Sequence, residues 1–247
     1  MKRIFLEDVT ADNLTIRGDD ARHLAYSLRA RRGDRLTAVD TAGRSAVIEL
    51  TDFDRNAINA RRVGEIQLVA VDRKIILADC LPKQNRFDTI VEKATELGVD
   101  RIVPLISDRT IARPNNFREK AKLERWSRIA KETAEQCARD TIPEISIIRT
   151  LDEWLKELTV IDEGNFFLLF CWEKEQSTTV REVLSAFKAS GSNKKIVVLI
   201  GPEGGFSDRE VREIKFSGGV SVTLGKRVLK TDTAAISALA MINYEFM

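Results

Sequence analysis

The chain has few of the residues that build metal sites and disulfide frameworks. Its 247 residues include three cysteines and one histidine. Cys80, Cys137 and Cys171 lie far apart and form no Cys-x-x-Cys pair, so we expect neither a zinc site nor a set of disulfides. Scattered cysteines in odd number are typical of a reducing compartment, which favours a cytoplasmic protein that needs no metal.

Long apolar runs and an excess of one charge are also missing. No stretch is long enough to span a bilayer, and the N-terminus turns acidic too early for a signal peptide. The 40 lysines and arginines nearly balance the 38 aspartates and glutamates. Net charge therefore says nothing about nucleic acid, and only the distribution of charge can.

The first part of the chain, residues 1–70, is predicted to be a small β-barrel domain. Closely spaced short strands interrupted by turns favour that fold, with one helix at about Asp20–Arg29. The predicted strands are Ile4–Leu6, Leu14–Ile16, Leu36–Asp40, Ser45–Phe53 and Ala57–Val63.

From Lys74 onward, strands and helices alternate. This pattern is typical of an α/β domain, here residues 74–247, in which helices cover both faces of a largely parallel sheet. The boundary is predicted near Val69–Lys74. Predicted strands are Ile75–Cys80, Arg101–Ile106, Ile145–Ile148, Phe166–Cys171, Ile196–Ile200 and Val220–Leu224. Predicted helices are Phe87–Leu97, Phe117–Ala138, Leu151–Leu158, Val180–Ala189, Asp208–Phe216 and the C-terminal tail.

Three of these strands end in segments suited to a ligand: Phe170-Cys-Trp-Glu173, Ile200-Gly-Pro-Glu-Gly-Gly205 and Leu224-Gly-Lys-Arg227. Ligands bind at the carboxyl ends of the strands in an open parallel sheet, so we expect the three segments to line one pocket. None of them is a P-loop or a dinucleotide motif, which disfavours triphosphate and nicotinamide chemistry. Ser207 and Glu210 have the spacing of a helix capping box.

The segment before the last helix gathers charge. Lys226, Arg227 and Lys230 precede Thr231, Asp232 and Thr233 at the predicted helix start. A helix N-terminus offers free N–H groups and partial positive charge, which suits a polar, partly anionic small molecule.

Nucleophilic and covalent catalysis are disfavoured. The only histidine lies far from the predicted pocket, and Cys171 sits in an apolar strand, where a buried structural cysteine is the usual finding. A group transfer in which a cofactor brings the reactive atom fits what remains.

Basic residues favour contact with a polyanion at several places, although any single arginine is more often just solvated surface. Arg29-Ala-Arg-Arg32, beside His23, is the strongest cluster. On the long predicted helix, Arg125, Arg128, Lys131, Glu135 and Arg139 form one stripe, and Trp126, Ile129, Ala130 and Thr133 form a buried face. The candidate residues for binding a polyanion such as a nucleic acid are Arg3, Arg22, His23, Arg29, Arg31, Arg32, Lys83, Arg86, Arg125, Arg128 and Arg139.

Four motifs together resemble the bacterial RsmE family, the 16S ribosomal RNA uridine-N3 methyltransferases of the SPOUT superfamily. The four motifs are Phe87-Asp-x-x-Val-Glu-Lys-Ala-Thr-Glu-Leu-Gly, Ala134-Glu-Gln-Cys-x-Arg139, Ile200-Gly-Pro-Glu-Gly-Gly-Phe-Ser and Leu224-Gly-x-Arg-Val-Leu-Lys-Thr-Asp-Thr-Ala-Ala-Ile. The resemblance implies a PUA-like barrel followed by a SPOUT-type parallel sheet with a C-terminal trefoil knot. It further implies S-adenosyl-L-methionine in the knot, a homodimer, and the small ribosomal subunit as partner.

The resemblance also implies roles for individual residues. We expect Arg227, Lys230, Arg86 and Asp232 to be catalytic, through stabilising charge on uracil oxygens or taking a proton. The expected cofactor-binding residues are Phe170, Cys171, Glu173, Ile200, Gly201, Pro202, Glu203, Gly204, Gly205, Leu224, Gly225, Arg227, Val228, Leu229, Thr233 and Ala234.

Two alternatives stay open. One is a SPOUT 2′-O-ribose methyltransferase, although the early Asn-x-x-Arg motif and the late Asn/Ser-Val-Ser/Ala run usual in those enzymes are absent here. The other is a non-catalytic RNA-binding assembly factor, which calorimetry with S-adenosylmethionine would distinguish by an absence of binding.

Overall fold

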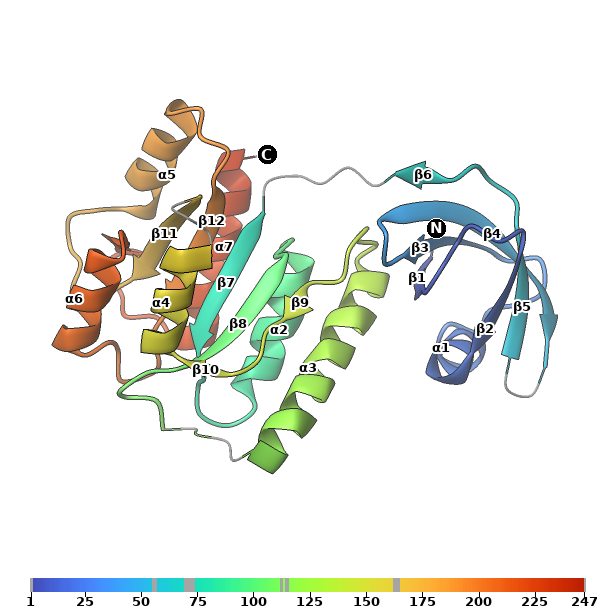
Figure 1. Ribbon diagram of the computed structural model, residues 1–247, viewed down its shortest axis with the longest axis horizontal. Coiled ribbons are helices and arrows are strands. Elements are labelled where there is room, and N and C mark those ends of the chain that lie inside the picture. The colour runs from blue at the N-terminus through green and yellow to red at the C-terminus, as the bar shows by residue number, and fades with distance from the viewer. Residues whose placement is uncertain are drawn as a thin grey trace. The chain divides into compact units, whose positions relative to one another are not determined.

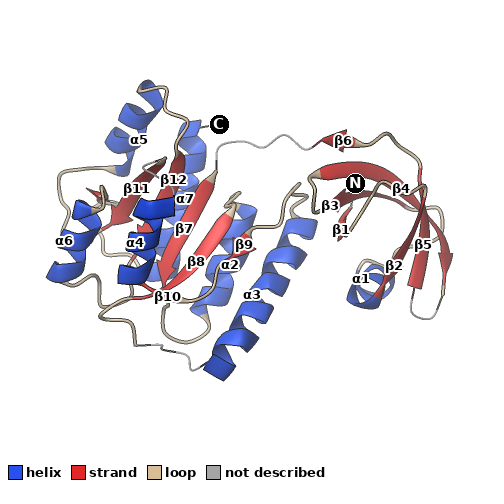
Figure 2. Ribbon diagram, in the orientation of Figure 1, coloured by secondary structure: helices blue, strands red, loops and turns tan. Residues whose placement is uncertain are grey.

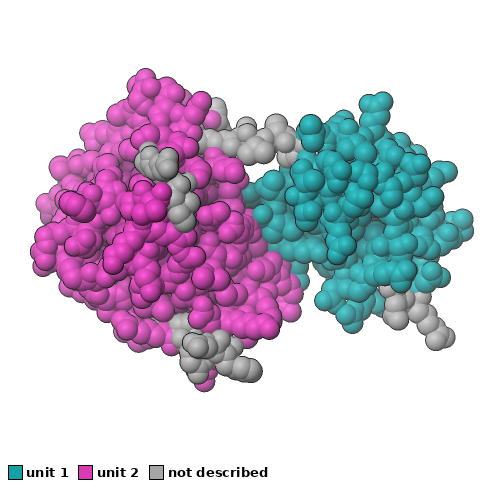
Figure 3. All heavy atoms as spheres, in the orientation of Figure 1, with its two compact units in different colours: residues 1–71, 131–142 teal, residues 72–130, 143–247 magenta. Residues whose placement is uncertain are grey.

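The chain forms two compact units. The computed structural model describes residues 2–54, 57–68, 74–111, 113, 116–161 and 165–246. Unit 1 contains residues 1–71 and 131–142, and unit 2 contains residues 72–130 and 143–247 (Figure 3). The predicted boundary at Val69–Lys74 lies, except for Lys74, outside the described residues.

Unit 1 is built on a curled, mixed sheet. Its strand order is β1-β3-β4-β5-β2, with β6 paired to β4. β1 runs parallel to β3, and the other pairs are antiparallel. Among the described residues β1 and β2 are the two edge strands and do not pair with each other, so the sheet is a half-barrel, whereas a small barrel was predicted (Figure 1). The strands are β1 (Arg3–Leu6), β2 (Asn13–Arg17), β3 (Arg35–Asp40), β4 (Arg44–Phe53), β5 (Ala57–Arg62) and β6 (Gln67–Leu68).

Alternation of apolar and polar residues places one face of this sheet in a core. Ala46, Ile48 and Leu50 of β4 are buried, and the residues between them are not fully buried. The helix predicted at Asp20–Arg29 is in fact shifted by two residues toward the N-terminus. It consists of α1 (Gly18–Arg22) continued by a π-helical turn, η1 (His23–Ser27), which packs Ala21 and Leu24 into the same core.

Unit 2 contains a parallel sheet between two helical layers (Figure 2). The strand order is β10-β8-β7-β12-β11-β13, with β9 paired to β8. Its strands are β7 (Ile75–Cys80), β8 (Arg101–Ile106), β9 (Glu144–Ile145), β10 (Arg149–Thr150), β11 (Phe166–Cys171), β12 (Lys195–Ile200) and β13 (Val220–Val222). Its helices are α2 (Arg86–Glu96), α4 (Leu151–Ile161), α5 (Val180–Ala189), α6 (Asp208–Phe216), α7 (Thr231–Phe246) and the first part of α3 (Asn116–Gln136). The residues of α3 from Lys131 onward belong to unit 1.

The two faces of this sheet belong to separate cores. Leu77 and Val198 pack with α2, α3, α5 and α7, whereas Ala78 and Leu199 pack with α4 and α6. Strands buried on both faces read as continuous apolar runs, which is why β7, β8 and β11 were predicted with the correct bounds. The single strand predicted at Ile145–Ile148 was wrong, because β9 ends at Ile145 and a second short strand, β10, begins only at Arg149.

Candidate active site

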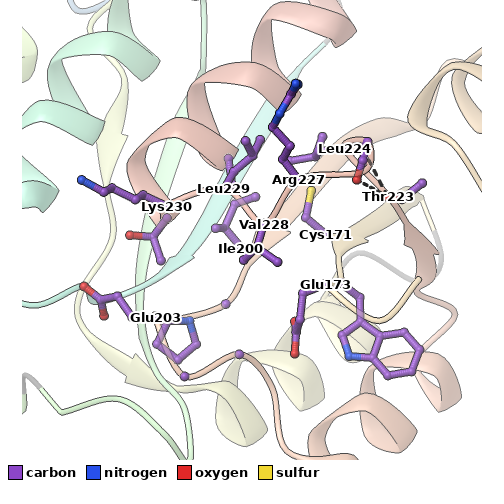
Figure 4. Close-up of a pocket in the computed structure, with 18 of the residues that line it drawn as sticks. Cys171, Glu173, Ile200, Glu203, Thr223, Leu224, Arg227, Val228, Leu229 and Lys230 are labelled. Carbon is purple, nitrogen blue, oxygen red and sulfur yellow. Dashed lines mark hydrogen bonds between the residues drawn. The ribbon is translucent and has the colours of Figure 1, made fainter. Parts of the chain in front are cut away.

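A pocket lies at the carboxyl ends of β11, β12 and β13. These ends are level, since Cys171 is in register with Ile200 on one side and with Val222 on the other. The loops that follow the three strands, together with the start of α7, enclose about 400 Å³, which is within the range of small-ligand sites. The lining residues are Cys171–Glu173, Ile200–Gly205, Thr223–Thr231 and Ala234 (Figure 4).

The loop after β12 is held in place by its neighbours on both sides. Ser207 and Glu210 form the predicted capping box, in which each side chain bonds the other's backbone N–H. Glu210 is fully buried and also accepts from the Asp108 N–H at 2.7 Å. Gly205 has φ +66°, and a Cβ there would lie 2.5 Å from Glu173 Oε1. The positive φ therefore favours glycine here, and a Cβ would displace the carboxylate of Glu173.

The loop after β11 is ordered by a residue that we did not predict. Glu175 accepts from the Ser221 hydroxyl of β13 at 2.6 Å and from the backbone N–H groups of Ser177 and Thr178. These bonds hold the pKa of Glu175 down at about 2. The carboxylate thereby ties the β11–α5 loop to the neighbouring strand on which the pocket depends.

The loop after β13 brings cations to the pocket. Gly225 turns the chain with φ +117°, and Lys226, Arg227 and Lys230 line the pocket from this loop. None of these three side chains has an ion-pair partner within the described residues, so their charge remains available to a ligand. Glu173 and Glu203 lie across the pocket from Arg227 and Lys230 (Figure 4).

Glu203 connects the pocket to the loop after β7. Its Oε1 accepts from the Lys83 N–H at 2.9 Å and lies 3.7 Å from Arg86 Nη1. Arg86, predicted to be catalytic, therefore reaches the pocket through Glu203 and does not itself line it.

Three buried polar groups at this end of the sheet have no hydrogen-bond partner among the described residues. They are the carboxylate of Asp79, the hydroxyl of Thr231 and the indole N–H of Trp172. Burial, with Glu203 and Asp232 nearby, raises the pKa of Asp79 well above its usual value. Asp79 was missed by the sequence analysis, although a lone carboxylate in the apolar run of β7 was a signal that could have identified it.

Several predicted residues lie outside the pocket lining. Phe170 is fully buried in the core between the sheet and α4 and α6, and Thr233 and Asp232 sit on the first turn of α7. Trp172 and Thr231 take part in the lining; both lie in segments predicted to bind a ligand, although neither was named among the cofactor-binding residues. Thr223 also lines the pocket and was not predicted. Burial and the nearby Asp79 raise the pKa of Cys171 to about 12, so this thiol stays protonated near neutral pH, in keeping with the structural role predicted for it.

In unit 1 the predicted RNA-binding arginines differ in exposure and in whether they form ion pairs. Arg3 pairs with Asp140 at 2.8 Å and its side chain is 17% exposed, so its predicted phosphate contact has no support from the geometry. Arg22 pairs with Asp19, and Arg32 lies 3.6 Å from Asp52. Arg29 and Arg31 are exposed and have no ion-pair partner within the described residues, and His23 is half-buried at the start of η1.

The stripe predicted on α3 was only partly right. Lys131 pairs with Asp20 at 2.6 Å. Glu135 accepts from the Phe5 N–H, and burial raises the pKa of Glu135 to about 7. These two residues therefore bind within unit 1 and are only partly exposed.

The remaining stripe residues keep some exposure. Arg125 pairs with Asp88 at 2.5 Å, Arg139 bonds Thr141, and Arg128 is exposed. On the other face of α3, Trp126, Ala130 and Thr133 are buried and Ile129 is half-buried, which confirms the face predicted to pack inward.

In the described part of the chain no helix is both long and apolar enough to cross a membrane. No group of three or more histidine, cysteine, aspartate or glutamate side chains there could hold a metal ion.

Known proteins resemble this chain over nearly its full length. A family model for an RNA methyltransferase domain matches residues 70–243. Ribosomal RNA small subunit methyltransferase E of Bacillus subtilis is 28% identical over 99% of this chain and 97% of its own length. The protein of the same name from Synechocystis is 30% identical over 96% of this chain and 75% of its own length.

Solved structures agree with these matches. The structure of ribosomal RNA small subunit methyltransferase E from Neisseria gonorrhoeae, bound to S-adenosyl methionine, has a TM-score of 0.85 at 26% identity and covers 99% of this chain and 97% of its own. A Legionella pneumophila protein in complex with the same cofactor has a TM-score of 0.80 at 26% identity, covering 98% of this chain and 96% of its own.

The parallel sheet and the pocket at its carboxyl edge define the class as an α/β fold with a small-ligand pocket built from strand-end loops. Within that class, the chain belongs to the RNA methyltransferase domain family and, in it, to the RsmE family of ribosomal RNA small subunit methyltransferases.

Proposed function

We propose that this protein transfers the methyl group of S-adenosyl-L-methionine to N3 of one uridine in the 16S ribosomal RNA of the small subunit. The observation that carries the proposal is the pocket formed by the three strand-end loops in a member of the RsmE family. A relative with the same fold was solved with S-adenosyl methionine bound, which supports the choice of cofactor.

The residues of the pocket fit that cofactor. Thr231 and Trp172 line it, and each has a buried polar atom with no hydrogen-bond partner among the described residues, which suits a bond to a polar ligand. The glycines of the 201–205 loop expose main-chain groups, and carboxylates from Glu173 and Glu203 are available to cationic groups. When bound, the cofactor supplies an electrophilic methyl carbon, so the protein has little bond activation to do.

The chain's own task is to position the uracil and to stabilise its charge. N3 carries a proton that must leave before N3 can attack, and negative charge then develops on the uracil oxygens. Arg227 and Lys230, unpaired at the pocket, suit the stabilisation of that charge. Arg86 holds Glu203, and we assign Asp232 or Glu203 as acceptor of the N3 proton. Alignment of methyl donor and acceptor supplies the remainder of the rate enhancement.

The two predicted domains would divide the work. We assign RNA binding to residues 1–70, as a PUA-like domain, and methyl transfer to residues 74–247. The exposed and unpaired cations Arg29, Arg31 and Arg128 are the best-supported phosphate ligands. Residues already engaged in ion pairs, such as Arg125, would contribute less.

We further propose a trefoil knot around the pocket and a homodimer. The knot proposal is supported by the participation of α7 and three separate loops in one enclosed site. The dimer proposal is supported by an apolar groove of about 490 Å³ between α5 and α7, which includes Leu184, Met241 and Tyr244. Met241 is 41% and Tyr244 80% exposed, and an isologous dimer would bury such a surface. A cytoplasmic location stays a prediction.

Mass mapping of methyl groups on ribosomal RNA tests the proposal. RNA from a strain lacking the gene should lack one uridine N3 methyl group that returns when the gene is restored. A methyl group that returns on a ribose 2′-oxygen would replace the proposed reaction with the ribose alternative. An identical methyl pattern in both strains, together with no calorimetric binding of S-adenosylmethionine, would favour the non-catalytic assembly factor.

A further inference from the structure

One aromatic side chain of unit 1 stands in solvent beside the basic cluster. Tyr26 is 78% exposed, whereas Ala21 and Leu24 of the same helical segment are buried in the core. It lies on the π-helical turn η1, between the cations Arg22 and Arg29 in sequence. Single π-helical turns are rare and frequently occur at functional sites. Packing within the unit does not account for a tyrosine at this position.

The turn after η1 holds an arginine in a conformation that favours glycine. Arg29 has φ +48°. The Ala30 N–H donates to Leu24 O at 2.9 Å, and the Leu28 N–H to His23 O at 3.0 Å. This is the left-handed helix ending at which glycine is the usual residue, because a Cβ strains it. An exposed arginine that has no ion-pair partner within the described residues is therefore kept three residues after Tyr26, at a cost in stability.

The turn is also fixed in place. The Lys2 ammonium donates to Leu28 O at 2.6 Å, and the Arg31 N–H donates to Asp34 Oδ2 at 2.8 Å. The exposed ring and the cations after it thus project from an ordered segment, which reduces the entropy lost when a ligand binds. Arg31, exposed and without an ion-pair partner in the described residues, extends the positive surface beyond Arg29.

We propose that Tyr26 stacks on an unpaired base of the ribosomal RNA while Arg29 holds a neighbouring phosphate. The inference rests on the proposed function, since it specifies how the same RNA substrate is gripped. Single-stranded RNA is the ligand that needs both features at once, because its bases offer π-faces and its backbone offers closely spaced anions. The contact selects for a splayed base and leaves the identity of that base open.

The test uses the full chain and a short single-stranded RNA that carries 2-aminopurine, whose fluorescence falls on stacking. Tyr26→Ala should bind about tenfold more weakly and lose the fluorescence change. Its melting temperature and the salt dependence of binding should be those of wild type, since no charge is removed. Tyr26→Phe keeps the ring and should bind as wild type does. Phe216→Ala removes a 91% exposed aromatic from unit 2 and is the matched control, with no change expected.

The Arg29→Gly variant tests the proposal independently, because it should change stability and RNA affinity in opposite directions. It should raise the melting temperature, because glycine accepts the left-handed conformation. It should also weaken RNA binding and reduce the slope of log K against log salt by about 0.7, the value for one phosphate contact on a single strand.

The outcomes separate the two proposals. If wild type methylates ribosomal RNA but Tyr26→Ala binds RNA as tightly as wild type, the stacking proposal is overturned and the proposed function stands. Equal losses in Tyr26→Ala and Tyr26→Phe would also overturn it, because the hydroxyl and not the ring would then make the contact. A wild-type chain that neither binds nor methylates ribosomal RNA removes the proposed function, and the stacking proposal with it.

Discussion

The pocket of unit 2 and the surface of unit 1 use arginine and lysine in different ways. In the pocket, Lys226, Arg227 and Lys230 come from one loop and, within the described residues, pair with no carboxylate. In unit 1 many arginines are neutralised. Arg44 pairs with Asp8 and Asp40, and Arg35 pairs with Glu49. A high arginine content therefore overstates the charge that unit 1 presents to a partner.

The difference predicts two kinds of mutational effect, one for the pocket and one for the surface of unit 1. Backbone conformation fixes the pocket, so a change at one residue affects the whole site. Solvent screens the charges of unit 1, so each unpaired cation should contribute a modest share of RNA binding.

The largest effect is expected for Arg227→Ala. We expect kcat for RNA methylation to fall about a hundredfold or more, because a donor aimed at the developing uracil charge is lost. The affinity for S-adenosylmethionine should fall much less than kcat, as measured by calorimetry beside a steady-state assay. Arg227→Lys keeps the charge without the fork of donors and should recover part of the activity. Activity of Arg227→Ala within about threefold of wild type would remove the residue from the catalytic set.

Gly205→Ala tests whether backbone geometry controls the pocket. The substitution puts a side chain at φ +66° and 2.5 Å from Glu173 Oε1, so we expect affinity for S-adenosylmethionine to fall about tenfold or more. Gly218→Ala is the matched control, because Gly218 has φ +85° with nothing within 4 Å of an added Cβ. Both variants should lose similar melting temperature, and only the first should lose binding. Equal cofactor affinity in the two variants would contradict a geometric role for Gly205.

A pair of arginines in unit 1 tests the other side of the comparison. Arg31 is exposed and unpaired within the described residues, whereas Arg35 lies 3.1 Å from Glu49. Arg31→Ala should weaken RNA binding by a few fold and lower the salt slope by about 0.7 to 0.9, as expected for one lost phosphate contact. Arg35→Ala should change both quantities less, as fluorescence titrations at several salt concentrations would show. A larger loss for Arg35→Ala would mean that pairing does not decide which arginines bind RNA.

The last prediction concerns stability alone and the fully buried Asp79, whose carboxylate has no hydrogen-bond partner among the described residues. Burial keeps its carboxyl protonated in the folded state, and the unfolded chain ionises it above the usual value of 3.8. Unfolding then releases a proton, so stability falls by about 1.4 kcal/mol per pH unit from there up to the raised folded pKa. Asp79→Asn removes this ionisation. Its melting temperature should exceed that of wild type at pH 8, and the gap should narrow toward pH 5. Parallel pH profiles for the two proteins would contradict a protonated Asp79.

Much of unit 2 could be predicted because its signals are local. The strand β12 is an apolar run, the Gly201–Gly205 turn follows at once, and Ser207 and Glu210 mark the next helix within a few residues. The pocket follows from a general rule for parallel sheets, so its three loops could be placed together before any coordinates were known.

What could not be predicted depends on contacts between residues far apart in the chain. Nothing near Arg3 or Lys131 in sequence indicates that they pair with Asp140 and Asp20. The open edge between β1 and β2 is likewise a property of the assembled sheet and not of either strand. Glu175 was missed because its role depends on Ser221 of a neighbouring strand.

A crystal of the protein soaked with S-adenosylmethionine tests the central claim most directly. The account predicts density for the cofactor between the loops 171–173, 200–205 and 223–230, with the methyl group facing Arg227 and Lys230. Density elsewhere on the molecule, or an empty pocket at saturating cofactor, would contradict it.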